Sequence, residues 1–375
     1  MRPEIIAKLT KSMTIQGLDA VVAVSPENFA YISGFVVPSQ PLMRWRHAAY
    51  VVTADGKCAI LVVDMEESTT RAKAGGVEVR AWGEFTDRPM SQLASLLSDL
   101  GLTRAKIGTE MDYLPAAAFA ELSAALPAVK FSAVDESLAR LRQIKTPAEV
   151  DALRHLSRIA DRAINDALCG VRTGSSEMDI AAALTRGIFE QGAQNFKLLI
   201  VATGERSVFP NVGPTERRVV PGDICRVEIF PIINGYHAGV CRTARVEHSP
   251  PHADAIWRNL VECKYLILDM IKPGASSRAI YEAFIAHLGK LKLPPIKFVG
   301  HGIGLHLHEK PYLGAYSDVP LEAGMVLGIE PLVYNSGHGF GMQNKDMVAV
   351  TETGCALLSD VTNTDTLFTI GKSSA

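Results

Sequence analysis

The chain has 375 residues, of which 47% are hydrophobic and 21% are charged, and its formal net charge is −2. That length is ample for two or three domains with large cores. The near-neutral charge argues against a general nucleic-acid or membrane-surface binder. No run approaches the roughly 20 apolar residues that a membrane span needs, and the N-terminus lacks the apolar stretch of a signal peptide.

The cysteines indicate a reducing compartment. The six cysteines are scattered, and no two are spaced as a CxxC pair. A chain of this length does not need disulfide bonds to form a stable core, so the sequence predicts a reduced, cytoplasmic protein.

The first part of the chain alternates strands with helices, which predicts an α/β domain at 1–140. An amphipathic opening helix precedes the first strand, and an Asp55-Gly56 turn separates the second strand from the third. The elements expected here are strands at 17–24, 47–53 and 59–63, a helix at 90–100, and a strand that begins at 106.

A helix start marks the beginning of a second domain, expected at 141–375. Thr146 is placed to cap the helix, Pro147 suits its first position, and Glu149 completes a capping box. Apolar residues then recur at helical spacing over 150–168.

The remainder of the second domain shows helices and strands in two batches, which favours an α+β domain over a doubly wound parallel sheet. Helices are expected at 177–191, 253–271 and 276–288, and strands at 198–203, 224–231, 239–246, 325–333, 347–351 and 366–370.

A series of polar and glycine-rich motifs in the second domain carries the strongest functional signal. In chain order these motifs are Glu228, Gly235-Tyr236, Gly239, Arg242-Thr243, His301 with its Gly-Ile-Gly, His308-Glu309, Gly328-Ile329-Glu330-Pro331 and Lys345-Asp346. This ordered set resembles the superfamily of creatinase, prolidase and methionine aminopeptidase. Asn28–Phe35 and Lys145–Val150 resemble the entry motif and the inter-domain connector of its larger members. The resemblance implies a pita-bread catalytic domain preceded by a creatinase/prolidase-type N-terminal domain.

In the metal-dependent members of this superfamily, two Asp, one His and two Glu side chains hold two divalent ions. The matching positions here are Glu228, Gly239, His301, Glu330 and Lys345. Glycine offers no ligand, and an ammonium about 4 Å from a dication is strongly repelled. We therefore expect no metal and no other cofactor, with Lys345 as the fixed positive charge. The alternative is that one metal ion is retained on Glu228, His301 and Glu330.

Within the superfamily, the absence of metal resembles the creatinase branch. The match is partial, because Asn211 stands at the position of creatinase's catalytic histidine and Cys241 at that of a substrate-binding glutamate. The resemblance therefore implies a relative of creatinase with a different substrate.

Three histidines are candidate acid–base groups, because imidazole titrates near neutral pH. His301 and His308 match pocket histidines of the superfamily, and His237 follows Tyr236, where creatinase uses aromatic groups on its substrate. Each histidine can instead be a buried structural residue, and Tyr236 can simply fill a sheet face.

The carboxylates and the cysteine also have two interpretations. Glu228 and Glu330 stand in apolar strands, where an unpaired carboxylate is costly, so either can pair with Lys345 for catalysis or for structure. Cys241 is expected to contact substrate or to fill the core. It would act as a nucleophile only if a histidine lowered its pKa.

Two arginines in the first domain suggest how a substrate carboxylate is bound. Arg44 and Arg46 flank Trp45, and a guanidinium binds carboxylate in a bidentate manner. The resemblance to creatinase implies a homodimer in which the N-terminal domain of one copy contributes to the partner's active site. A solvated loop with cation–π packing is the alternative.

The sequence thus favours a metal-independent, creatinase-like hydrolase that cleaves a C–N bond of a small carboxylate-bearing metabolite. A lyase, a catalytically inactive binding module and a metal-dependent Xaa-Pro dipeptidase are the alternatives. The expected partners are a small-molecule substrate and a second copy, with no nucleic acid and no membrane.

Overall fold

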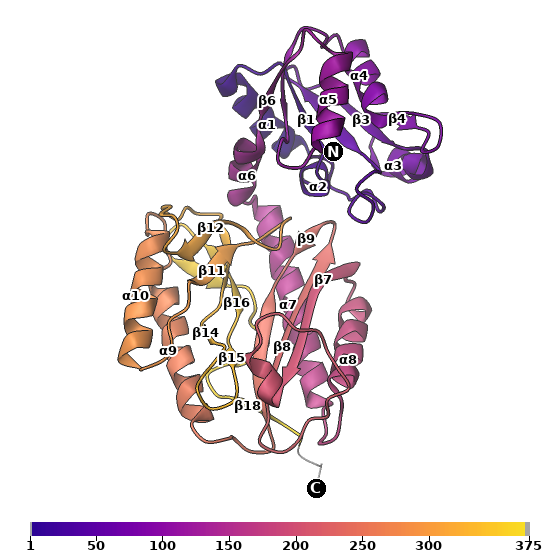
Figure 1. Cartoon of the computed structure of the whole chain (residues 1–375). Helices are drawn as coiled ribbons and strands as arrows, with labels where there is room; N and C mark the ends of the chain where they lie inside the picture. Colours follow the sequence, from indigo (N-terminus) through magenta and orange to yellow (C-terminus); the bar gives the residue numbers. More distant parts are fainter. Residues whose placement is uncertain (1, 372–375) are drawn as a thin grey trace. The chain divides into compact units, whose positions relative to one another are not determined.

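The computed structural model describes residues 2–371, which divide between Arg142 and Gln143 into two compact units (Figure 1). None of the helices in this described range is long and apolar enough to cross a membrane. Each unit is described by itself.

The N-terminal unit is a mixed six-stranded sheet with helices packed on it. The strand order is β4-β3-β2-β1-β5-β6, with β1 antiparallel to β2 and parallel to β5. Its strands are β1 (Ala20–Ala23), β2 (Ala49–Thr53), β3 (Cys58–Val63), β4 (Glu78–Trp82), β5 (Lys106–Thr109) and β6 (Lys130–Ala133). Its helices are α1 (Pro3–Gln16), α2 (Pro26–Ser33), α3 (Glu67–Lys73), α4 (Pro89–Asp99), α5 (Ala116–Ala125) and α6 (Asp135–Gln143).

The strands predicted in this unit are confirmed, with small differences at their ends. The strand expected at 17–24 begins only at Ala20, because Gly17 adopts a left-handed conformation (φ 64°) and caps α1. Two central strands, β1 and β2, are buried along their whole length, as expected of strands covered on both faces.

The C-terminal unit contains two five-stranded sheets and one two-stranded sheet. One large sheet has the order β18-β10-β8-β7 with β9 paired to β8, the other has the order β12-β11-β13-β16-β17, and β14 pairs with β15. Strands of the first are β7 (Asn195–Thr203), β8 (Ile224–Ile233), β9 (Tyr236–His237), β10 (Val240–Val246) and β18 (Phe368–Ile370). The others are β11 (Phe298–Gly302), β12 (Glu309–Gly314), β13 (Val326–Ile329), β14 (Leu332–Val333), β15 (Met342–Gln343), β16 (Asp346–Val350) and β17 (Cys355–Leu357).

Four helices cover these sheets. The helices α7 (Pro147–Cys169) and α8 (Glu177–Glu190) pack together beside β7 and β8, whereas α9 (Ala253–Met270) and α10 (Ser277–Lys290) lie beside the second sheet (Figure 1). The predicted capping box of α7 is confirmed, because Thr146 accepts the Glu149 amide hydrogen and Glu149 accepts that of Thr146. The α+β prediction is confirmed as well.

Two predicted strands differ from the structure at motif residues, because one is interrupted and the other starts one residue later. The strand expected at 325–333 ends at Ile329 and resumes at Leu332, so Glu330 lies in the break. The strand expected at 239–246 begins at Val240, after a break that contains Gly239. An isolated antiparallel bridge between Cys241 and Lys345 joins the two large sheets here, with N···O distances of 3.3 Å in both directions.

A buried set of ion pairs connects the strands and helices behind this junction. We call Arg242, Asp161, Asp346 and Lys264 the Asp346 network. Arg242 lies 2.9 Å from Asp161 and 2.9 Å from Asp346, and Lys264 lies 2.7 Å from Asp346. The Arg242 guanidinium also donates to the Lys345 carbonyl at 2.8 Å. The network therefore fixes the backbone from which Lys345 extends.

Candidate functional site

The motif residues of the C-terminal unit meet around one ammonium group. The Lys345 Nζ atom lies 3.1 Å from Glu228 Oε1, 3.4 Å from Glu330 Oε2 and 3.2 Å from His301 Nε2. It also lies 4.6 Å from the centroid of the Phe230 ring. All five residues are buried, and we call them the Lys345 cluster.

The opposite charges of the cluster keep both kinds of group ionised despite burial. Burial alone would raise the pKa of Glu330, but Lys345 and the His301 hydrogen bond outweigh it and lower that pKa to about 2. Burial alone would lower the pKa of Lys345, but Glu228 and Glu330 outweigh it and raise that pKa. The cluster thus holds a permanent positive charge between two carboxylates.

Phe230 occupies the space that a side chain at position 239 would need. A Cβ atom built on Gly239 would lie only 2.2 Å from the Phe230 ring. Phe230 was not among the predicted site residues. Strand alternation was the available signal, because Arg226, Glu228 and Phe230 are spaced to lie on one face of β8.

The two pocket histidines are stacked. The rings of His301 and His308 lie 3.8 Å apart at 25°. His301 is fully buried with Nδ1 2.8 Å from the Gly302 carbonyl, whereas His308 is exposed. Partial burial, with nearby His301 and Lys345, lowers the pKa of His308 to about 4. His308 is therefore neutral at pH 7 and can accept a proton at the solvent edge of the cluster.

A buried relay that the sequence analysis missed supports Glu330. Gln343 donates to Glu330 Oε2 at 2.9 Å and accepts from Arg226 at 2.9 Å. The Arg226 guanidinium also donates to the Phe209 and Pro210 carbonyls and lies 5.5 Å from the Tyr334 ring. Arg226 stands two residues before Glu228 on β8, so strand alternation was the available signal for Arg226.

His237 lies next to the His301 loop rather than on the ammonium. Its backbone amide donates to the Gly304 carbonyl at 2.7 Å, and its Nδ1 lies 3.2 Å from the same oxygen. Its Nε2 is buried with no hydrogen-bond partner in the described part of the chain. Burial lowers the pKa of His237 to about 4, so the ring is neutral and Nε2 is an acceptor.

Cys241 is unsuited to nucleophilic attack. The residue is fully buried, and burial together with the charge of Glu228 raises the pKa of its thiol well above the usual value. A protonated thiol is a poor nucleophile. The side chain is a core residue beside the cluster.

Tyr236 and Asn211, both predicted to bind substrate, lie in different surroundings. The Tyr236 hydroxyl donates to Glu149 at 2.5 Å, which connects β9 to the first turn of α7. Asn211 is exposed, two residues after the Phe209 carbonyl that Arg226 contacts.

The two arginines of the N-terminal unit that were predicted to bind substrate differ in their hydrogen bonds. Arg46 donates twice to Glu84, at 2.8 and 2.7 Å, so its guanidinium is already held within its own chain. Trp45 donates to the same carboxylate at 3.2 Å and is 62% exposed. Arg44 is exposed, and the described contacts show no hydrogen bond or ion pair for it.

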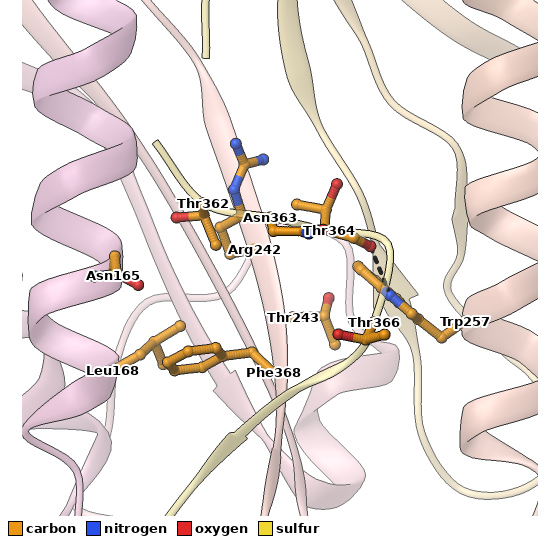
Figure 2. A pocket seen from close by; sticks show the side chains of 10 residues that line it. All are labelled: Asn165, Leu168, Arg242, Thr243, Trp257, Thr362, Asn363, Thr364, Thr366 and Phe368. Carbon is orange, nitrogen blue, oxygen red and sulfur yellow. Dashed lines mark hydrogen bonds between the residues drawn. The ribbon is translucent and has the colours of Figure 1, made fainter. Parts of the chain in front are cut away.

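A small pocket lies on the other side of Arg242 and is chemically unlike the cluster. Figure 2 shows it between α7, β10, α9 and the segment 362–368. Its lining is Asn165, Leu168, Arg242, Thr243, Trp257, Thr362, Asn363, Thr364, Thr366 and Phe368, with a hydrogen bond from Trp257 to the Thr364 carbonyl at 2.9 Å. This lining contains no carboxylate, imidazole or thiol, so it offers no acid–base chemistry.

Comparison with known proteins identifies the class. Residues 151–352 match the model of metallopeptidase family M24, and residues 5–144 match the creatinase/prolidase N-terminal domain. The chain belongs to this family. Its fold, predicted from the motifs, is confirmed, and as a member of a peptidase family it is placed among hydrolases of C–N bonds.

Several relatives match over nearly the whole chain. A Xaa-Pro dipeptidase of Pyrococcus furiosus is 27% identical over 95% of this chain and 97% of its own length. A probable dipeptidase, PepE, of Mycobacterium bovis is 29% identical over 92% and 90%. The solved structure of dipeptidase PepE from Mycobacterium ulcerans is 28% identical, with a TM-score of 0.83 over 98% of this chain and 97% of that one.

These relatives correct the leading functional prediction. We expected a metal-independent, creatinase-like hydrolase of a small metabolite, and that expectation is wrong, because the full-length relatives are named as dipeptidases. They favour the alternative of a Xaa-Pro dipeptidase and give no support to a metal-free creatinase-like branch.

The residues of this chain nevertheless do not fit the two-ion centre that the family name implies. Gly239 offers no donor, and Lys345 places an ammonium between Glu228 and Glu330. No group of three or more His, Cys, Asp or Glu side chains within residues 2–371 is arranged to hold a metal ion. The donor set and the family name thus disagree.

Proposed function

We propose that the protein hydrolyses the peptide bond of dipeptide-sized substrates of the Xaa-Pro type. The observation that carries this proposal is the full-length similarity to dipeptidases at 27% and 29% identity, with the Lys345 cluster formed by the motif residues of the M24 domain. The exposed His308 ring stacks on His301 of this cluster, and we place the scissile bond beside His308.

The cluster supplies two of the functions that amide hydrolysis needs. The tetrahedral intermediate places negative charge on the carbonyl oxygen, and a fixed positive charge such as that of Lys345 stabilises it. Neutral His308 can take a proton from water and return it to the leaving nitrogen. Glu330, ionised and held by Gln343, keeps Lys345 in place.

A panel of peptides tests this proposal. Ala-Pro, Ala-Ala and Ala-Pro-Ala are incubated with the purified protein as isolated, with added Mn²⁺, and with chelator, and free proline or alanine is quantified by mass spectrometry. We expect release from dipeptides and much less from the tripeptide. Failure to cleave any of the three under every condition contradicts the proposal. The tested variant is His308→Gln, and its matched control is His155→Gln, which replaces an exposed histidine on α7.

We also infer that the chain assembles as a homodimer through its N-terminal unit. Leu42, Trp45, Met65 and Phe85 are exposed large apolar side chains. Arg46 contacts Met65 directly, and it shares the Glu84 carboxylate with Trp45. Such exposed patches mark interaction sites. Light scattering of Trp45→Glu should show a smaller species than the parent, and an unchanged mass would contradict this inference.

A further inference from the structure

The buried ammonium of Lys345 is in contact with four different groups. Two carboxylates, one imidazole nitrogen and one aromatic face surround the ammonium, at 3.1, 3.4 and 3.2 Å from the polar atoms and 4.6 Å from the ring centroid. A carboxylate attracts any cation, and an aromatic face adds a cation–π attraction for an ammonium group. Divalent ions require oxygen or imidazole ligands instead.

Position 239 is coupled to this aromatic face. The Phe230 ring lies where a Cβ atom on residue 239 would approach it to 2.2 Å, so a carboxylate at 239 and the ring at 230 exclude each other. Phe230 is fully buried and cannot turn into solvent without opening the sheet. The glycine at 239 makes room for the Phe230 ring, and the ring contacts Lys345, so the residues at 239 and 345 are coupled through Phe230.

We propose that Phe230 and Gly239 adapt the centre of this site to hold one monovalent ammonium, that of Lys345, and that this ammonium excludes a divalent ion from it. Glu228, His301 and Glu330 already face the ammonium. Lys345→Glu adds a fourth donor in place of the resident cation, and four such donors suit a divalent ion. This inference concerns what fills the centre, and it does not depend on which substrate is cleaved.

Metal binding measures the first half of the inference. The parent, Lys345→Glu and Lys345→Gln are stripped with chelator and titrated with Co²⁺, which is followed by calorimetry and visible absorption. We expect one equivalent in Lys345→Glu and substoichiometric binding in the parent and in Lys345→Gln. One tightly held equivalent in the parent, or none in a folded Lys345→Glu, overturns the inference.

A double-mutant cycle measures the second half. Gly239→Ala should lower the melting temperature of the parent, because its methyl group meets the Phe230 ring, and it should do so much less in a Phe230→Ala background. Additive effects of the two substitutions would overturn the coupling. Gly289→Ala, at a helical position with nothing within 4 Å of the added Cβ, is the control for a glycine change without a clash.

Both measurements are independent of turnover. If no dipeptide is cleaved but Lys345→Glu binds Co²⁺, the proposed function is wrong and the inference about Lys345 is supported. If dipeptides are cleaved and the parent itself binds one equivalent, the reverse holds.

Discussion

Two buried charged groups lie back to back in the C-terminal unit and are built differently. In the Asp346 network, the guanidinium of Arg242 bridges two carboxylates at 2.9 Å, and Lys264 approaches Asp346 at 2.7 Å. In the Lys345 cluster, a single ammonium serves two carboxylates and an imidazole at 3.1 to 3.4 Å. The Asp346 network has the shorter contacts and joins α7, β10, β16 and α9. The Lys345 cluster is looser and reaches an exposed histidine.

This difference separates support from chemistry. Consecutive residues, Lys345 and Asp346, point into the two groups, and Arg242 holds the Lys345 carbonyl at 2.8 Å. The Asp346 network therefore sets the position of a side chain in the other group without contacting its reacting side. Substitutions in the Asp346 network should change stability, and substitutions in the Lys345 cluster should change turnover.

The largest expected effect on stability is that of Arg242→Ala. Asp161 and Asp346 would lose their shared guanidinium while buried, and breaking a buried pair in this way costs about 3–5 kcal/mol. Urea denaturation of the variant measures it. The control is Arg158→Ala, which breaks the exposed pair between Arg158 and Asp360 and should cost about 0–1 kcal/mol. Arg158 lies on the same helix as Asp161. Equal losses would show that the buried network is not what holds the strands.

The pH dependence of stability should depend on His237. Its pKa is lowered by burial from 6.5 to about 4, so the unfolded chain takes up a proton between these values that the folded chain does not. Stability is therefore full above pH 6.5 and falls as the pH approaches 4, by roughly 3 kcal/mol at most from this residue. His237→Gln should flatten the fall measured by urea denaturation between pH 7 and 4. An unchanged slope would contradict the assignment, and His155→Gln checks for a general effect of losing a histidine.

A smaller effect is expected where the relay supports the cluster. Gln343→Ala leaves Arg226 and Glu330 each without one hydrogen bond, which costs about 1–3 kcal/mol. Because Glu330 also holds Lys345, turnover should fall as well, and Gln343→Glu should not restore it, since the new carboxylate would repel Glu330. Full activity in Gln343→Ala would show that the relay is only structural.

Much of the fold was predictable because its signals are local. The capping box of Thr146 and Glu149 and the apolar spacing that follows it identify α7 without any tertiary information. The breaks at Gly239 and Glu330 were not predicted. The apolar run around Glu330 hides one break, and Gly239 was expected to be the first residue of a strand rather than to precede it. Both breaks arise where two sheets meet, and that meeting depends on contacts between segments about 100 residues apart, such as Cys241 with Lys345.

The site was predictable only as a set of residues. His301, Glu228, Glu330 and Lys345 come together as their motifs indicated. Phe230, Gln343 and Arg226 were missed because nothing in a single sequence states which neighbour a buried side chain faces. The pairing of Arg46 with Glu84, 38 positions away, was not predicted for the same reason. The metal-free branch was inferred from the ligand positions alone, and full-length relatives named as dipeptidases do not support it.

Dipeptide cleavage by Lys345→Met, measured beside Lys264→Met, tests the separation of chemistry from support most directly. Both variants remove one buried lysine that is paired with a carboxylate, one from each group. Lys345→Met should lose at least about 100-fold in the kcat/KM of its folded fraction, the scale of a lost electrostatic stabiliser. Lys264→Met should melt at a lower temperature and keep the kcat of its folded fraction. The reverse pattern, an active Lys345→Met and an inactive but stable Lys264→Met, would contradict the account.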